Sequence, residues 1–208
     1  MLQKLKRLTV EERLKSLGLT VFTPQEFRDI FSVSANTASA FIKNNVTSGL
    51  LIKLRNSFYL IKDSHPSHLF IANRLCSPSY ISLETALSHY GIIPEVVYTT
   101  TSITTKIPRE YETPIGTFSY QCIKKEAYAG YSLQEIDGRK VFIAEAEKAL
   151  ADHLYFVDLK RVSLNDRLEL RSINQAGLVR WANLFQRPGL LKLVDKIYAE
   201  YQQSRKIY

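Results

Sequence analysis

The sequence predicts an α+β protein: an N-terminal winged helix-turn-helix, followed by a mixed domain with a small antiparallel sheet and flanking helices. Helical apolar periodicity covers much of the first 47 residues, and two short apolar runs around a basic turn follow it. Residues 95–143 are rich in Thr, Tyr, Val and Ile and contain turn signals. The polar segment 63–68 has a proline and no periodicity, so it predicts a linker between domains 1–62 and 69–208.

Positive charge is concentrated at the N-terminal end of the chain. The 208 residues carry a formal net charge of +8. Residues 1–62 hold ten Lys and Arg against four Asp and Glu, a net of +6, whereas residues 63–208 hold eighteen against sixteen, a net of +2. This distribution predicts an acidic partner that meets the N-terminal domain, with simple solubility as the alternative.

Two helices are predicted before residue 32. Leucines at near-helical spacing predict a basic amphipathic helix over residues 1–17, with Thr9 as a cap for its second half and Gly18 as its stop. Thr23–Glu26 combines a capping threonine, a proline at the first helical position and a glutamate that bonds back to the cap. The second helix therefore begins at this stretch and ends near Phe31.

A third helix follows, capped by Ser34 and running to about Thr47. Its apolar stripe is Ala38, Phe41, Ile42 and Val46. Small and mostly uncharged residues point the other way: Asn36, Ser39, Ala40, Lys43 and Asn44. Short side chains that hydrogen-bond to base edges and phosphates suit a helix in the major groove of DNA.

A basic hairpin is predicted directly after this helix. The runs Leu50–Leu54 and Ser57–Ile61 are joined by a turn at Arg55–Ser57, which places Lys53 and Arg55 at the tip, within reach of flanking phosphates or the minor groove. The predicted contacts to duplex DNA are Ser34, Asn36, Thr37, Ser39, Lys43, Asn44, Lys53, Arg55 and Asn56. The alternative is a winged fold that contacts protein, with these side chains as an ordinary solvated surface.

The second domain should begin with helices over residues 67–75 and 82–90. A largely antiparallel sheet of four or five strands should follow over residues 95–143, and then a helix over "AEAEKALADHLYF". On this helix Ala149, Leu150, His153 and Leu154 are expected to be buried, and Glu147 or Lys148 to tether the helix to the sheet. Two more helices, split near Pro188-Gly189, complete the chain.

A second basic surface is possible on this domain. Four cationic residues flank predicted strands: Lys124, Lys125, Arg139 and Lys140. Ordinary solvated strand ends are the alternative interpretation.

No catalytic residue, metal site or cofactor is predicted. Glu145-x-Glu147-Lys148 is similar to a nuclease cluster, but on a helix residues i and i+2 face apart. His65-x-x-His68 has helical spacing for zinc, yet no cysteine or carboxylate nearby completes a tetrahedral set. We expect a protein that is not an enzyme, with nuclease activity as the alternative.

The sequence also bears on cellular location. The start has no signal-peptide pattern, and no run of about 18 apolar residues could span a bilayer. Cys76 and Cys122 fit no ligand spacing, so they are expected to be reduced residues of a cytoplasmic protein without membrane contact.

Three segments resemble a known family: "YISLETALSHYGIIPE" at 80–95, "YETPIGTFSYQCI" at 111–123 and "GRKVFIAEAEKALADHLYF" at 138–156. They resemble the AbiEi-type antitoxins of type IV toxin–antitoxin pairs, also described as transcriptional regulators of a viral-defence system. The resemblance implies an autorepressor that binds inverted repeats in its own promoter. It also implies a functional partner, a co-transcribed nucleotidyltransferase toxin. The alternative is an interaction module that neutralises its partner directly; the operator, half-site spacing and oligomeric state stay open, including monomers that pair on DNA.

Overall fold

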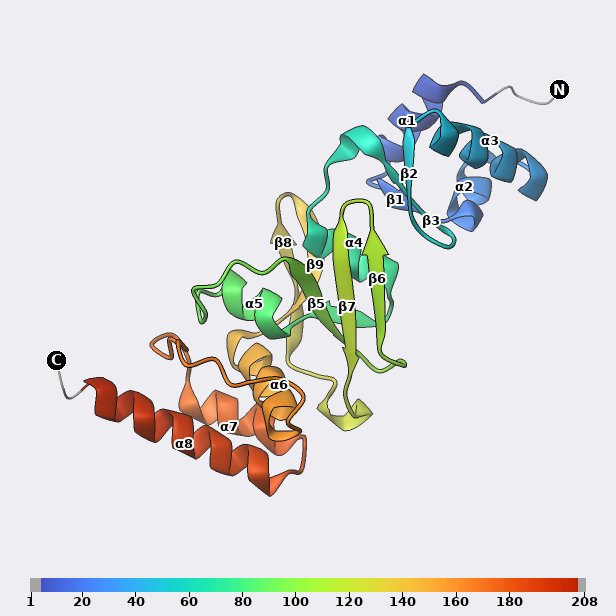
Figure 1. Ribbon diagram of the computed structural model, residues 1–208. Coiled ribbons are helices and arrows are strands. Elements are labelled where there is room, and N and C mark those ends of the chain that lie inside the picture. The colour runs from blue at the N-terminus through green and yellow to red at the C-terminus, as the bar shows by residue number, and fades with distance from the viewer. Residues whose placement is uncertain (1–4, 206–208) are drawn as a thin grey trace.

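The computed structural model describes residues 5–205, an α+β chain in which a small N-terminal unit adjoins a larger C-terminal one (Figure 1). The N-terminal unit has three helices and a three-stranded antiparallel sheet in the order β1-β3-β2. Its elements are α1 (Arg7–Ser16), β1 (Val21–Phe22), α2 (Pro24–Phe31), α3 (Ala35–Thr47), β2 (Leu51–Arg55) and β3 (Phe58–Ile61).

The starts and ends of these helices follow local sequence signals, with one exception. The capping box at Thr23 and Glu26 is formed, and Gly18 follows α1 with a φ of 68°. The prediction that Thr9 caps the second half of the first helix is wrong, because Thr9 lies inside an unbroken α1. The helix begins at Arg7, two residues earlier, and its N-cap Lys6 makes no side-chain cap bond. Residues 1–4 of that predicted helix lie outside the described residues.

The three-stranded sheet is buried on both faces. Side chains on one face pack with the N-terminal helices: Phe22, Leu51, Tyr59 and Ile61. Side chains on the other face join the core of the C-terminal unit: Val21, Ile52, Leu54, Phe58 and Leu60. The sheet is therefore both the base of the N-terminal unit and its contact with the rest of the protein.

Polar contacts also join the two units. Arg74 donates to Glu26 Oε1 at 2.5 Å and to the Val21 carbonyl at 3.3 Å, and Arg139 donates to the Gly18 carbonyl at 3.2 Å. The segment predicted as a linker contains the end of a short 3-10 helix, η1 (Lys62–Ser64), and the first residue of α4. The units are thus packed together and not only joined by a covalent connection.

The C-terminal unit contains a sheet with helices against it (Figure 1). Its first elements are α4 (His68–Leu75), β4 (Ser79–Ile81), α5 (Leu83–His89), β5 (Thr99–Thr104), β6 (Arg109–Thr113) and β7 (Gly116–Cys122). The remaining elements are η2 (Lys125–Ala127), β8 (Tyr131–Ile136), β9 (Arg139–Ala144), α6 (Ala146–Asp158), α7 (Gln175–Asn183) and α8 (Pro188–Arg205). All five predicted helices of this unit are present, and Pro188 begins α8 instead of lying between helices.

The four or five strands predicted over residues 95–143 are present as β5 to β9, and three of the five neighbouring pairs are antiparallel, but the sheet differs from the prediction in two respects. It has six strands in the order β6-β7-β5-β4-β9-β8, and two neighbouring pairs, β5 with β7 and β4 with β9, run parallel. The β6–β7 hairpin folds back so that β7 lies between β6 and β5. Strand β4 was not predicted because it has only three residues, lies between two helices and shows no usable periodicity.

Helix α6 is held against the sheet by a buried polar cluster. Lys148 forms an ion pair with Asp152 one turn later, and neither side chain is exposed. Asp152 Oδ2 also accepts hydrogen bonds from Tyr80 at 3.0 Å and from Ser82 at 2.7 Å, at the end of β4. The predicted tether is confirmed for Lys148, which acts through Asp152. Glu147 instead accepts from the backbone N–H of Asn174.

Candidate nucleic-acid interface

Helix α3 is positioned by its cap and by its buried face. The Ser34 hydroxyl accepts from the backbone N–H of Thr37 at 3.2 Å, which satisfies one of the free donors of the first turn. Ala38, Ile42 and Asn45 are buried. Phe41 stacks on Phe27 of α2 with ring centroids 5.2 Å apart, which fixes the angle between the two helices.

The opposite face of α3 is exposed, as the sequence predicts. Four of the predicted contact residues share it: Asn36, Ser39, Lys43 and Asn44. In Figure 1, α3 lies on the outer side of the N-terminal unit, and β2 and β3 lie between it and the larger unit. No residue of the second unit up to Arg205 covers this face.

Ser34 and Thr37 have a more local role than predicted. Their hydroxyl groups are 2.9 Å apart and hydrogen-bonded to one another, in addition to the cap bond. Thr37 is also half-buried. Both side chains therefore stabilise the first turn of α3, and only Ser34 is exposed.

A groove of about 260 Å³ separates α3 from the hairpin. Ser39, Lys43 and Thr47 line it from α3, and Lys53 and Tyr59 line it from β2 and β3. The two lysines are exposed, and neither forms an ion pair with a carboxylate among residues 5–205. Because no Asp or Glu occurs between residues 30 and 62, the charge of this groove is uncompensated along that part of the sequence.

Arg55 does not lie free at the hairpin tip, which corrects its predicted role. Its Nε and NH2 atoms donate to the Leu75 carbonyl at 3.1 and 2.6 Å. Its guanidinium lies 4.0 Å from the ring centroid of Phe58 and 4.9 Å from that of Tyr111 on β6. Arg55 therefore fastens the hairpin to the C-terminal unit, and only Asn56 and Ser57 remain exposed in the turn.

The four residues of the predicted second basic surface are not brought together. Lys124 and Lys125 stand at η2, which Figure 1 places at the end of the sheet away from the N-terminal unit. Arg139 contacts Gly18 of that unit, and its guanidinium lies 4.7 Å from the ring centroid of Phe70. Lys140 is exposed at the rim of a groove of about 400 Å³. The idea of one cationic patch is therefore wrong.

Of the residues considered for enzymatic or metal chemistry, Glu145, Glu147 and His68 have structural contacts. Glu145 lies 3.9 Å from Arg180, and Glu147 binds the backbone at the start of α7. His65 is exposed, and His68 packs against Phe118 with ring centroids 5.8 Å apart. Over residues 5–205 there is no cluster of three or more metal-ligating side chains.

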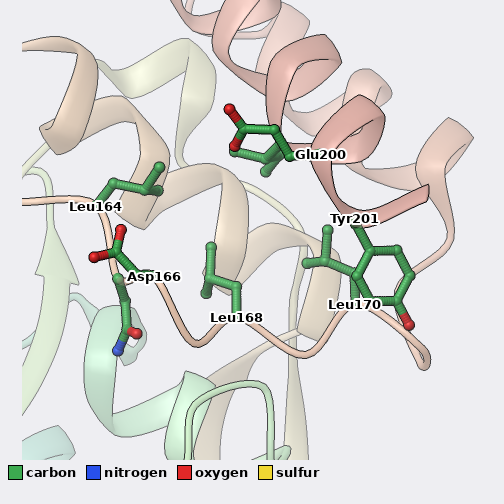
Figure 2. Close-up of a pocket in the computed structure, with 8 residues that line it drawn as sticks. Leu164, Asp166, Leu168, Leu170, Glu200 and Tyr201 are labelled. Carbon is green, nitrogen blue, oxygen red and sulfur yellow. The ribbon is translucent and has the colours of Figure 1, made fainter. Parts of the chain in front are cut away.

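A separate hollow of about 340 Å³ lies between α8 and the segment that precedes α7 (Figure 2). Leu164, Leu168 and Leu170 form part of its wall, and Asp166 and Glu200 carry the charge. Both charged groups are carboxylates, which repel phosphate. This hollow therefore does not extend the candidate interface.

Two comparisons with known proteins were negative. No protein-family model matches the chain. A search of curated proteins also finds no significant match. Among the described helices, none is long and apolar enough to cross a membrane.

Proposed function

We propose that residues 5–62 form a winged helix-turn-helix that binds duplex DNA. In this assignment α2 and α3 are the helix-turn-helix, and β2 and β3 are the wing. Helix α3 enters the major groove, where Asn36, Ser39 and Asn44 face base edges. Lys43 and Lys53 neutralise phosphates on either side of the groove between helix and wing.

The proposal rests on one observation. The exposed polar face of α3 has no carboxylate, and two lysines without ion-pair partners, Lys43 and Lys53, lie on opposite sides of the groove next to it. The wing has a smaller part than a free loop would have, because Arg55 is committed to the second unit. A wing that is fixed in place presents Lys53 at a constant distance from α3. Rigid presentation lowers the entropy cost of binding.

The test is a fluorescence anisotropy titration of the whole chain on a labelled duplex from upstream of its own gene, between 50 and 200 mM salt. Replacing Lys43 or Lys53 by alanine should weaken binding to all sequences and reduce the slope of log K against log salt by about 0.9 for each phosphate that the protein no longer neutralises. Lys192→Ala, an exposed lysine on α8, is the matched control and should bind as wild type does. Unchanged isotherms for both test variants would overturn the assignment.

We further propose that the protein is an autorepressor and the antitoxin of a nucleotidyltransferase toxin in the cytoplasm. This step is supported by the resemblance of residues 80–95, 111–123 and 138–156 to AbiEi-type antitoxins. Repression is tested with a reporter driven by the upstream DNA, and the antitoxin role by co-expression with a nucleotidyltransferase encoded next to the gene. Reporter expression that does not change when the protein is present would contradict the autorepressor role. Growth arrest that the protein does not relieve would contradict the antitoxin role.

Direct capture of a partner protein is the alternative. It predicts an exposed apolar patch on the C-terminal helices. The large apolar side chains that are exposed among the described residues are Leu8, Leu17, Val96, Tyr98, Ile107, Leu133, Phe142 and Val162, and none of them belongs to α7 or α8. This distribution favours the DNA-binding proposal.

A further inference from the structure

A small cavity in the C-terminal unit lies apart from the proposed DNA interface. It has a volume of about 130 Å³ and lies among α5, β5, β7 and the end of α6. Leu83, Phe156 and Val162 supply its apolar walls. This volume is well above the ~10–15 Å³ that a single water needs, so the cavity has room for several waters or a small ligand. A concave site with apolar walls and a few convergent polar groups is the usual form of a small-molecule site.

One buried polar atom of the cavity, on His153, has no hydrogen-bond partner. The His153 side chain is only 5% exposed, and its Nε2 is not hydrogen-bonded within the described chain. Its Nδ1 faces Glu84 Oε1 at 3.3 Å, so this ring nitrogen has a partner. Buried polar atoms are nearly always satisfied, so an unsatisfied Nε2 on a cavity wall points to a ligand.

Two polar side chains on β7 line the same cavity. Ser119 and Gln121 are two residues apart on the strand and therefore share a face. Neither makes a side-chain hydrogen bond to another described residue. Thr101 on the neighbouring strand differs, because its hydroxyl already donates to the Ser82 carbonyl at 2.8 Å. Ser119 and Gln121 are thus available to a bound molecule.

The charges of the cavity are balanced. Glu84 supplies the one carboxylate of the lining and Arg161, just beyond α6, supplies the one guanidinium. Arg161 is exposed and forms no ion pair in the described part of the chain. A ligand that satisfies both groups carries one positive and one negative charge.

The backbone beside Glu84 is strained. Leu83, in the cavity wall, has a φ of +56°, a conformation that a side chain of this kind rarely adopts. Such strain persists only where the surroundings enforce it, and it is concentrated at ligand sites. The strained residue places Glu84 at the start of α5, facing His153.

From these contacts we propose that the cavity binds a small zwitterion of the amino-acid type. The ammonium group donates to His153 Nε2, which has a lone pair when Nδ1 carries the proton toward Glu84, and the Glu84 carboxylate balances its charge. The carboxylate lies against Arg161, with the Ser119 hydroxyl and the Gln121 amide as further donors. Binding therefore gives His153 Nε2 the hydrogen-bond partner that it lacks within the chain.

The experiment follows the ring nitrogens of His153 by NMR in the full chain with ¹⁵N-labelled histidine, assigned with a His153→Gln variant. L-serine, L-alanine and L-glutamine are titrated singly into the protein. At least one should give a saturable shift of the His153 signals, while the signals of the exposed residues His65, His68 and His89 stay in place. Shifts that are absent with all three, or that grow linearly and equally at all four histidines, overturn the proposal.

Two comparisons test the charge argument. L-lactate lacks the ammonium group and ethanolamine lacks the carboxylate, so each should bind at least tenfold more weakly than the amino acid that binds. Arg161→Gln should weaken binding of that amino acid and of L-lactate about tenfold and leave ethanolamine binding unchanged; the Arg161 side chain is exposed, so the fold should be kept. Equal binding of lactate or ethanolamine would overturn the zwitterion assignment.

Discussion

Lys148 and Asp152 form an ion pair one turn apart on α6, with both side chains fully shielded from solvent. Burial lowers the pKa of Lys148 and raises the pKa of Asp152, because both charged forms lose hydration. The pair is retained because each partner has further contacts. Asp152 accepts from Tyr80 and Ser82, and the Lys148 ammonium lies 4.8 Å from the ring centroid of Phe185.

Breaking this pair should destabilise the protein strongly. Lys148→Met leaves a buried carboxylate without its cation, and Asp152→Leu leaves a buried cation, so each should lower the free energy of unfolding by about 3–5 kcal/mol. The double variant leaves neither charge and should recover most of the loss. Urea unfolding measures all three variants. Single variants that are each destabilised by less than about 1 kcal/mol would contradict the importance of the pair.

Arg55 and Lys53 lie two residues apart on β2 and should behave oppositely. Arg55→Ala removes two charge-assisted hydrogen bonds to the Leu75 carbonyl, so it should lower the free energy of unfolding by about 1.5–3 kcal/mol. It should leave the salt slope of DNA binding unchanged, because Arg55 is not free to reach a phosphate. Lys53→Ala should lower the slope and leave stability within about 0.5 kcal/mol of wild type. A reversed pattern would mean that the hairpin leaves the second unit when DNA binds.

Local signals in the sequence predict much of the N-terminal unit. The cap at Ser34, the capping box at Thr23 and the turn after Arg55 each depend on a few neighbouring residues. The destination of the Arg55 side chain depends instead on Leu75 and Tyr111, which are distant in sequence. A basic residue in a hairpin is the same pattern whether it meets a phosphate or a carbonyl of its own chain.

In the C-terminal unit too, the local sequence predicts which residues are buried but not the contacts between segments that are distant in sequence. Burial of Ala149 and Leu150 follows from helical period and is confirmed. The cavity around His153 was not predicted, because its lining comes from four separate segments and a lone histidine on an apolar face carries no sequence signal. A charged pair at spacing i, i+4 within the apolar stripe of α6 was the available clue to the buried Lys148–Asp152 pair.

Acid should weaken the contact between the two units through Glu26. Burial alone would raise its pKa, but hydrogen bonds and charge from Arg74, with bonds to Thr23, lower it below the usual 4.5. A carboxyl group with a lowered folded-state pKa contributes stability that is complete above the unfolded-state pKa and is lost as pH falls through the folded value.

The pH test therefore compares wild type with Glu26→Gln, which can keep a cap bond but not the charge. The difference in their free energies of unfolding should be constant near neutral pH and should shrink as the pH falls below 4.5. Chemical denaturation between pH 3 and 7 measures it. A difference that does not change with pH would mean that the ion pair with Arg74 contributes nothing.

Gly130 should tolerate alanine less well than Gly138, although their backbone angles are nearly equal. Their φ values are +74° and +70°, so the backbone strain of a Cβ is similar at both positions, about 1 kcal/mol. A Cβ at Gly130 would lie 2.9 Å from Trp181 Cε2 and 3.0 Å from Lys148 Cγ, whereas one at Gly138 meets nothing within 4 Å.

Because the ring of Trp181 and the buried Lys148 stem cannot move freely, Gly130→Ala should cost about 1–3 kcal/mol more than Gly138→Ala. Urea unfolding of the two variants gives this difference directly, with the shared backbone strain cancelled. Equal destabilisation of the two variants would show that α7 can move away from the loop before β8. The Lys148–Asp152 pair would then be less tightly enclosed than its burial indicates.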